Sequence, residues 1–454
     1  MIRPLKFTVV LGNERLITPS GLSLVGRFLE KSELEKRSNS LNIEKRSQAQ
    51  IPNSDILKTY IGMLCQGKPA YESVNEFHED EEAMELMLGL KKGLPSEATL
   101  RQRLDLIGNQ LRDNILASNI SMFTRYGVKV SANSEGYVPL DVDVTPFDNS
   151  RTKKDGVSRT YAGYDGYAPI MAYIGTEGFL ANAELREGKT HCQKGTPDFL
   201  RETIRCAKQM SDGKLLLRLD SGNDAVDNVG VCEDLGVDYI IKRNLRKESP
   251  AAWLSIVHDK STNVKKPREG KIVYIGSFEW SAKIPRINEN GEAEKKEMKL
   301  RLVYEIIERT ITKDGQMLLA PEVVTNMWLT SLGLPDETII NLYHAHGESE
   351  QFHSEIKSDM DVERLPSGKF DTNALVLELT IIAYNILRMI GQESLRGKDT
   401  PLKRPVKRRR LRTVITNLIL IASRITKHAR RVLVSLGCSN AWRAAFMRCY
   451  ARFA

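Results

Sequence analysis

The chain is predicted to be an α/β protein, in which a mixed sheet with a β-rich insertion lies between a helical N-terminal region and a basic helical C-terminal region. Its 454 residues are 41% hydrophobic and 28% charged, which is typical of a soluble protein with more than one domain. Segments that resemble strands and segments that resemble helices alternate only in the middle of the chain. Lys and Arg residues are concentrated at the C-terminal end.

The N-terminal region, residues 1–125, is predicted to be mostly helical. Apolar residues recur at helical spacing, and Ser96 is placed to cap the last helix of the region. Short helices that end in one bearing Arg101 and Arg103 are compatible with a helix-turn-helix reader of DNA. Any small helical bundle gives a similar pattern, so both interpretations stay open here.

After Ser131 the pattern changes to strands linked by helices. The predicted order is βββαβαβ, with the last two strands parallel to the first. The strands are expected at residues 137–144, 160–175, 179–188, 214–220 and 237–243, and the helices at 196–210 and 224–236. A β-rich insertion follows up to about residue 320, and another strand over residues 321–329 precedes the next helix.

The C-terminal part combines an apolar helix with a basic block. The apolar stretch 374–391 is interrupted by Glu378, Asn385 and Arg388, which predicts a buried helix and not a membrane span. Residues 401–454 contain fourteen Lys and Arg and no Asp or Glu, within a net charge of +9. Apolar residues at helical spacing over 413–437 predict a folded helix.

The basic residues of that predicted helix suggest a partner. They would fall on one stripe, formed by Arg424, Lys427, His428 and Arg431. A solvated basic tail is the competing interpretation. A basic block that is folded favours nucleic acid as the partner.

Cysteine usage indicates the compartment. The six cysteines are scattered, with no Cys-x-x-Cys pair, which argues against a zinc ribbon or a disulfide framework and fits a reducing cytoplasm. The N-terminal apolar run "FTVV" is too short for the core of a signal peptide.

Acidic residues mark the ends of two predicted strands. Asp141 and Asp143 lie two residues apart, so both project from one face of their strand. Asp220 closes the apolar run "LLLRL", and ligands of open α/β sheets gather beyond such carboxyl ends. Carboxylates brought together in this way repel each other unless a divalent cation lies between them.

The stretch "YHAHGESEQFHSEIK" supplies further candidates. On a helical wheel, one face presents Tyr343, His346, Glu350 and Lys357. Glu348 and Glu355 fall on the other side. A zinc site would have to use His344, His346 and His353, which do not share one face, and a solvated helix is the third interpretation.

The spacing Tyr343, His346, Glu350, Lys357 resembles the Tyr-(2)-Arg-(3)-Glu-(6)-Lys signature of bacterial insertion-sequence transposases. These are DDE transposases with an RNase H-like catalytic core. The segments "PSEATLRQRL" and "SGKFDTNALVLELTIIAYNIL" and the Arg-rich C-terminus are most like the IS-thirteen-eighty group. The chain departs from the signature at His346, where Arg is usual, and at Asn223, where an aromatic residue is usual.

The resemblance implies a domain organisation and a reaction. The expected regions are 1–125 for DNA binding, 126–245 and 321–395 for the two parts of the RNase H-like core, 246–320 for the insertion, and 396–454 for DNA binding or dimerisation. Asp143, Asp220 and Glu350 would hold two Mg²⁺ ions, for which Mn²⁺ can substitute, with Asp141 a rival for the first position. The enzyme would cleave the element's ends and join the freed 3′-hydroxyls to target DNA.

The resemblance also implies DNA contacts. We expect them from Tyr343, His346, Lys357, Arg101, Arg408, Arg409 and Arg410. In related transposases a Trp stacks on a flipped base, and here Trp328 or Trp280 are the candidates for that role, unless they are core residues.

The expected partners are double-stranded transposon-end DNA and target DNA, bound by a homodimer with no membrane involved. The expected location is the bacterial cytoplasm, in association with the nucleoid. Two alternatives remain: a catalytically inactive, transposase-derived DNA-binding protein, and an RNase H-like nuclease without strand transfer.

Overall fold

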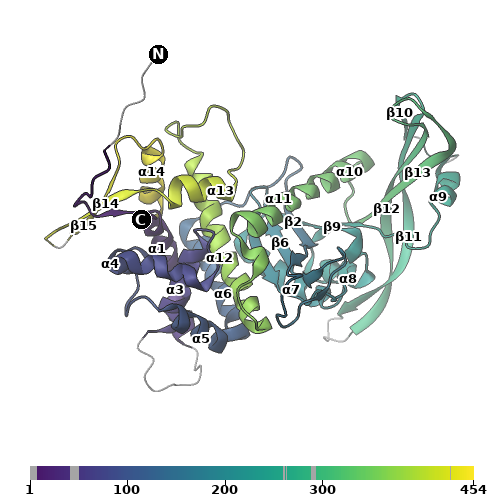
Figure 1. Ribbon diagram of the computed structural model, residues 1–454. Coiled ribbons are helices and arrows are strands. Elements are labelled where there is room, and N and C mark those ends of the chain that lie inside the picture. Colours follow the sequence, from purple (N-terminus) through teal and green to yellow (C-terminus); the bar gives the residue numbers. More distant parts are fainter. Residues whose placement is uncertain (1–7, 41–50, 259–260, 262, 288–292, 430) are drawn as a thin grey trace, which may run out of the picture.

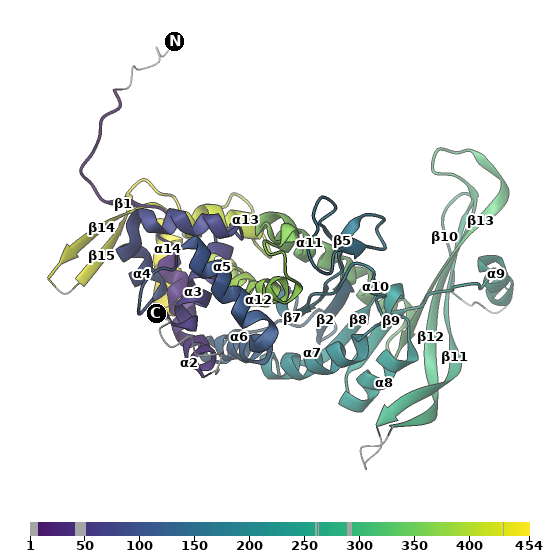
Figure 2. The same cartoon turned by 60° about the horizontal axis from the view of Figure 1, so that its bottom comes forward.

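The computed structural model describes residues 8–40, 51–258, 261, 263–287, 293–429 and 431–454. Helices and the C-terminal elements gather at one end of the molecule, the central sheet follows, and a long β insertion projects at the other end (Figures 1 and 2). Asp141 and Asp143 lie in the central sheet, and Asp220 directly follows one of its strands.

The central sheet has nine strands in the order β10-β11-β12-β13-β9-β8-β2-β6-β7. Its core strands are β2 (Tyr137–Val144), β6 (Ile170–Ile174), β7 (Phe179–Glu184), β8 (Lys214–Leu219) and β9 (Asp238–Lys242). β2, β8 and β9 are parallel neighbours, whereas β6 is antiparallel to both β2 and β7. The helices α7 (Thr196–Met210) and α8 (Val226–Leu235) connect β7 to β8 and β8 to β9. The predicted order βββαβαβ is therefore confirmed.

One predicted strand is divided. The segment predicted as a single strand over 160–175 contains β5 (Asp165–Tyr167) and β6, separated by Ala168 and Pro169. β5 pairs instead with β3 (Phe147–Asp148) and β4 (Ser158–Arg159) in a small separate sheet. Pro169 has no backbone N–H to donate to a sheet ladder, so the change of partner falls where a proline is tolerated.

The β-rich insertion is an extension of the central sheet. It consists of α9 (Pro250–His258), β10 (Asn263–Arg268), β11 (Lys271–Ile287), β12 (Ala293–Ile311) and β13 (Met317–Thr330). β13 pairs antiparallel with β9, where Trp328, Leu329 and Thr330 lie opposite Lys242, Ile241 and Ile240. β13 runs through the predicted boundary at residue 320, so the sheet continues without interruption from the insertion into the core.

The N-terminal region is helical, as predicted. Its helices are α1 (Leu22–Lys31), α2 (Leu34–Asn39), α3 (Asn53–Leu64), η1 (Tyr71–Asp80), α4 (Glu81–Leu88), α5 (Glu97–Ile107), η2 (Gly108–Leu111) and α6 (Arg112–Tyr126). The side chain of Ser96 accepts a hydrogen bond from the backbone N–H of Thr99 at 3.3 Å, which confirms the predicted N-cap. The helix capped by Ser96 ends at Ile107, and the φ of +47° at the following Gly108 is a conformation that glycine adopts readily.

The long helix α12 (Phe370–Ser394) forms the core between these helices and the sheet. It is long and apolar enough to cross a membrane, but 94% of its most apolar window is buried inside the molecule. The predicted buried helix is therefore confirmed.

The helix predicted over residues 413–437 is wrong. After α13 (Leu411–Val414) and η7 (Ile415–Ile419), the chain forms a hairpin of β14 (Ser423–His428) and β15 (Arg431–Leu436), followed by α14 (Arg443–Phe453). β14 pairs on its other side with β1 (Leu16–Ile17), which comes from the opposite end of the chain. Because side chains alternate along a strand, Arg424 and Lys427 point to opposite faces and the predicted basic stripe does not form.

Candidate active site

Asp143 and Asp220 lie side by side at one edge of the central sheet. β2 and β8 are parallel neighbours in which Val142 is opposite Leu219, so the residue that follows each is brought to the same edge. Asp143 is the next residue of β2, and Asp220 follows directly after β8. This is the carboxyl edge of the strands, where ligands of α/β sheets bind.

Asp220 is held in an environment that disfavours its charge. Burial, together with the negative charge of Asp143, raises the pKa of Asp220 above its usual value. Asn223 opposes this effect, because its Nδ2 donates a hydrogen bond of 2.8 Å to Oδ1 of Asp220. Asn223, which stands where the resembled transposases usually have an aromatic residue, therefore orients the carboxylate of Asp220.

Asp141, the rival for the first position, is already neutralised. Arg218 lies opposite it on β8 and donates two hydrogen bonds, from Nε at 2.6 Å and from Nη2 at 2.7 Å. His346 donates a third from Nδ1, at 3.0 Å. Burial opposes the charge of Asp141, but Arg218 and His346 outweigh it and lower its pKa. Asp141 is therefore committed to an internal ion pair.

The segment with the transposase-like spacing runs along the end of β2 in several short helical turns. They are α10 (Asp336–His344), η4 (Ala345–Glu348), α11 (Ser349–Ser354) and η5 (Glu355–Asp359), so the single regular helix assumed for the wheel is replaced by a helix with a 3₁₀ turn and a π turn.

One face of this segment contacts β2 and the loop after it at three points. His346 reaches Asp141, and Nε2 of His353 lies 3.5 Å from Oδ2 of Asp143. Lys357 donates a hydrogen bond of 2.9 Å to the carbonyl oxygen of Pro146. This face is therefore the one that meets the carboxylate edge.

Glu350 is exposed on this segment. It lies four residues after His346 and three before His353, which places it on the same side of the helix as both. Within the part of the chain that the structure describes, no group of three His, Cys, Asp or Glu side chains is close enough to hold a metal ion. The structure thus brings Asp143 and Asp220 together, and Glu350 is not in contact with them.

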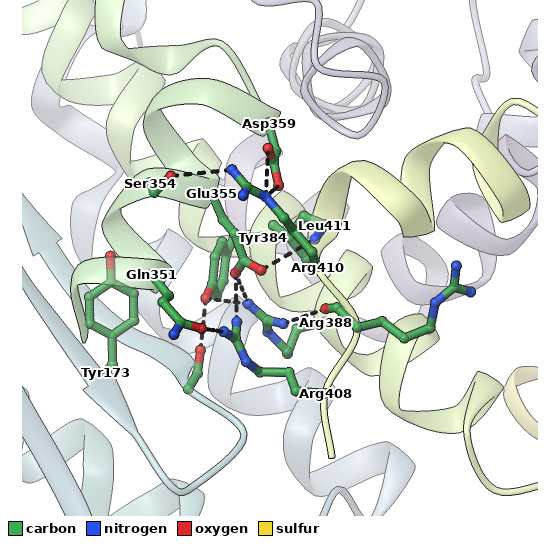
Figure 3. Close-up of polar contacts among 12 residues, drawn as sticks. Tyr173, Gln351, Ser354, Glu355, Asp359, Tyr384, Arg388, Arg408, Arg410 and Leu411 are labelled. Carbon is green, nitrogen blue, oxygen red and sulfur yellow. Dashed lines mark hydrogen bonds and ion pairs between the residues drawn. The ribbon is translucent and has the colours of Figure 1, made fainter. Parts of the chain in front are cut away.

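The opposite face of the segment is held by hydrogen bonds and ion pairs with arginines of α12 and of the C-terminal segment (Figure 3). The carboxylate of Glu355 is buried and accepts hydrogen bonds from the guanidinium groups of Arg388 and Arg408, the latter at 2.9 Å. Asp359, one turn further, accepts from Nε of Arg410 at 2.8 Å. Glu355 therefore faces away from the carboxylate edge, as the sequence predicts, but it is a core residue and not a solvated one.

The arginines predicted to contact DNA have partners within the chain. Arg408 pairs with Glu355 and lies over the ring of Phe352, 4.5 Å from its centre. Arg409 is buried, with its guanidinium 4.0 Å from the ring centre of Trp442, and burial lowers its pKa to about 10. The contacts of Arg408 attach the C-terminal segment to the candidate catalytic helix, whereas Arg409 packs within the C-terminal region.

Other predicted DNA contacts differ in their accessibility. Trp328 is 1% exposed and packs against Tyr343, so it is a core residue and not an accessible stacking partner. Trp280 is half-buried, with Arg243 5.2 Å from its ring centre. His346 is buried against Asp141, whereas Arg101 is exposed on α5.

Tyr343 and Lys357 are half-buried at the site. The ring of Tyr343 lies 5.7 Å from that of His346, and burial with the charges of Asp220 and Asp143 raises the pKa of Tyr343. Nζ of Lys357 is 2.8 Å from Oε1 of Glu363. Both side chains therefore border the carboxylate edge.

The sequence did not point to Tyr161 or Arg218 as site residues, and it raised His353 only as part of a zinc site. Tyr161 is largely exposed, but its hydroxyl donates a hydrogen bond of 3.0 Å to the carbonyl oxygen of Val144, and desolvation there with the charges of Asp143 and Asp220 raises its pKa to about 12. Only Arg218 could have been found from the sequence. It stands two residues before Asp220, just as Asp141 stands two residues before Asp143. Tyr161 and His353 lie outside the strands that carry Asp143 and Asp220, and only the tertiary fold brings them to the site.

Comparison with known proteins identifies the class of the chain. Residues 7–454 match the family model of the "Transposase DDE domain group 1", so the chain belongs to this family of transposases. No curated protein sequence matches it. One similar solved structure is the piggyBac transposase synaptic complex with hairpin DNA, at 10% identity and a TM-score of 0.41, covering 89% of this chain and 80% of that one.

Proposed function

We propose that this protein cleaves the ends of its transposon and joins the freed 3′-hydroxyls to target DNA. The pair formed by Asp143 and Asp220 carries the proposal. A half-buried carboxylate whose pKa is raised by desolvation and by a second carboxylate is a poor arrangement for stability alone, and a bound divalent cation would relieve the repulsion.

The donor set fits a hard cation such as Mg²⁺, which prefers carboxylate oxygens. Asp143 is the better first ligand, because Arg218 and His346 already occupy the oxygens of Asp141. Glu350 would be the third ligand, from the same side of the helix as His353. Mn²⁺ shares this ligand preference.

Metal ions held there would make a water or a 3′-hydroxyl nucleophilic and would stabilise the leaving 3′-oxygen. The chain's own residues prepare the site. Asn223 orients Asp220, and His353 lies against Asp143. Lys357 ties the helix to the loop that follows β2 by its bond to Pro146. Tyr343 and Tyr161 border the carboxylates, where a phosphate of the DNA end would lie.

The wider assignment rests on the order of motifs and strands. The core order β7-β6-β2-β8-β9, with only β6 antiparallel to the others, supports an RNase H-like catalytic core. The signature spacing and the flanking segments support the IS-thirteen-eighty group. We further propose a homodimer that acts on DNA in the bacterial cytoplasm, in association with the nucleoid.

The first test separates chemistry from binding. Asp220→Ala should abolish strand cleavage in Mg²⁺ and leave binding of transposon-end DNA unchanged, because the change removes a proposed metal ligand and no basic side chain. Gel shift and cleavage on the same DNA ends measure both. Substantial cleavage by Asp220→Ala would refute the site, and a wild-type protein that binds but never cleaves would favour the inactive DNA-binding alternative.

A matched pair of variants tests the third ligand. Glu348 and Glu350 are both exposed and two residues apart, so Glu348→Gln controls for the loss of one surface charge. Glu350→Gln should eliminate cleavage and strand transfer of a supercoiled donor plasmid, whereas Glu348→Gln should retain most of both. The reverse result would show that the helix presents a different residue to the carboxylates.

A further inference from the structure

The C-terminal hairpin exposes an unpaired apolar strand. In the described part of the chain, β15 pairs with β14 alone and forms one edge of the three-stranded sheet β1-β14-β15. Val432, Leu433 and Val434 are all exposed on it. Proteins usually protect such an edge with charges, a proline or a covering segment, because its free N–H and C=O groups accept another strand.

A hollow lies directly beside this edge. It has a volume of about 530 Å³, and Val432, Val434 and Ile425 of the hairpin line it together with Leu86 and Met87 of α4 and its C-terminal end. Val432 and Val434 alternate along β15, so their side chains share the face that borders the hollow. A strand added to β15 would send every second side chain toward the same hollow, the arrangement by which sheet edges recognise extended peptides.

The chain itself carries a segment with matching properties. Residues 8–11 precede β1, form no helix or strand, and lead away from the body of the molecule (Figures 1 and 2). Val9, Val10 and Leu11 are each at least 76% exposed. Consecutive β-branched and apolar residues favour an extended strand that is buried on at least one side.

Within its own copy, this segment would have to be fully extended to reach the edge of the sheet. β1 and β15 lie on opposite sides of β14, so a strand added beyond β15 would be three strand spacings, or about 14 Å, from β1. Arg15 is fixed beside β14, since its carbonyl oxygen accepts a hydrogen bond from the N–H of Ile425 at 3.0 Å. From Arg15 to Leu11 a fully extended chain spans at most about 14 Å, which leaves no length to cross over the face of the sheet.

We propose that residues 8–11 of one copy of this protein add as a strand to β15 of a second copy, with Val9 and Leu11 entering the hollow. Each copy carries both the segment and the edge, so a reciprocal exchange closes a two-fold dimer. This inference rests on the homodimer proposed above, for which it names the interface, and it does not depend on the catalytic site.

Cross-linking between two distinguishable chains tests the exchange. Both carry Cys438→Ser, because Cys438 is exposed. One chain has Val10→Cys and the other, of different mass, has Ser435→Cys; Leu433 and Ser435 alternate with the valines and lie on the face away from the hollow. When the two are co-expressed, a short bismaleimide should give the mixed dimer.

The controls decide between a second copy and other occupants. Leu319→Cys, in the exposed part of β13, replaces Val10→Cys in the matched control and should give no mixed dimer. A chain with both Val10→Cys and Ser435→Cys that cross-links only within itself would overturn the proposal, as would the absence of any cross-link or a link only to a foreign protein.

Self-association provides the second measurement. Val9→Asp combined with Leu11→Asp should raise the dimer dissociation constant in sedimentation velocity by about a hundredfold or more, since two apolar side chains lose their burial. Val434→Asp on the edge should have a similar effect, whereas Leu319→Asp should have none. A wild-type protein that stays monomeric, or a dimer that survives the Val9 and Leu11 changes, would overturn the proposal.

Discussion

Replacing Glu355 by Gln should destabilise the protein without removing a catalytic group. Glu355 is 1% exposed and neutralises Arg388, which is equally buried, as well as the partly exposed Arg408. Removing one partner of a buried ion pair typically costs about 3–5 kcal/mol, because the other charge stays buried without compensation. Arg388 keeps hydrogen bonds to the hydroxyl of Tyr384 and the carbonyl of Arg409, so we expect the lower end, about 3 kcal/mol.

Urea unfolding and plasmid cleavage measured on the same preparations separate the two glutamates. Glu350→Gln changes an exposed side chain, and its free energy of unfolding should stay within about 0.5 kcal/mol of the wild type while cleavage is lost. Glu355→Gln should lose about 3 kcal/mol, which is a large part of the ~5–15 kcal/mol of a typical protein, and should cleave in proportion to its folded fraction.

The result that would refute this reasoning is a Glu355→Gln protein as stable as Glu350→Gln. A further check is the pair Glu355→Leu with Arg388→Met, which removes both charges. It should be less destabilised than the sum of the single changes, since neither charge is then left alone in the core. Simple additivity would mean that the ion pair contributes little.

Two further predictions concern charge elsewhere. Burial, partly offset by Arg112, raises the pKa of Glu378 to about 7. The folded protein therefore holds this proton, and it loses up to about 3 kcal/mol of stability as the pH rises from about 4.5 to 7. Glu378→Gln should reduce this difference in stability between pH 5 and pH 8 in urea unfolding, and an unchanged difference would assign it to other groups. The exposed Lys403 and Arg404 should contribute to DNA affinity, so replacing both by Ala should reduce the log–log salt slope of binding by about 0.9 for each DNA phosphate that is no longer neutralised. An unchanged slope would place the DNA elsewhere.

The strands and helices of the core were predictable because their patterns are local. The helix at 196–210 matches α7 residue for residue, and Asp220 follows its strand as expected. Alternation along β2 was enough to place Asp141 and Asp143 on one face. It could not distinguish between them, because the distinction comes from Arg218 on the neighbouring strand.

The hairpin β14–β15 shows where local patterns fail. The sequence from 413 to 437 satisfies a helical spacing of apolar residues, yet Ile425, Val432 and Val434 also satisfy the alternation of strands. The choice is made by β1, whose residues Leu16 and Ile17 lie some four hundred positions earlier and pair with β14. A window of one segment contains no information on such a partner.

The roles of the arginines were missed for a similar reason. A run of basic residues has the same appearance whether it binds a polyanion or an internal carboxylate. Arg408 and Arg410 are neutralised by Glu355 and Asp359, which lie about fifty residues earlier in the chain. Their position shows that the C-terminal segment packs against the side of the Glu350 helix that faces away from Asp143.

Because the insertion continues the central sheet, its length is fixed relative to the core. From Arg301, which lies opposite Thr330 near the junction with β9, to Ile311 near its far end, β12 advances ten residues. At about 3.3 Å per residue this is about 33 Å, close to the ~34 Å of one turn of duplex DNA. Apart from a register shift between Arg309 and Ile311, hydrogen-bonded strands connect the two points, so that interval is set by the backbone and does not vary as it would across a flexible linker.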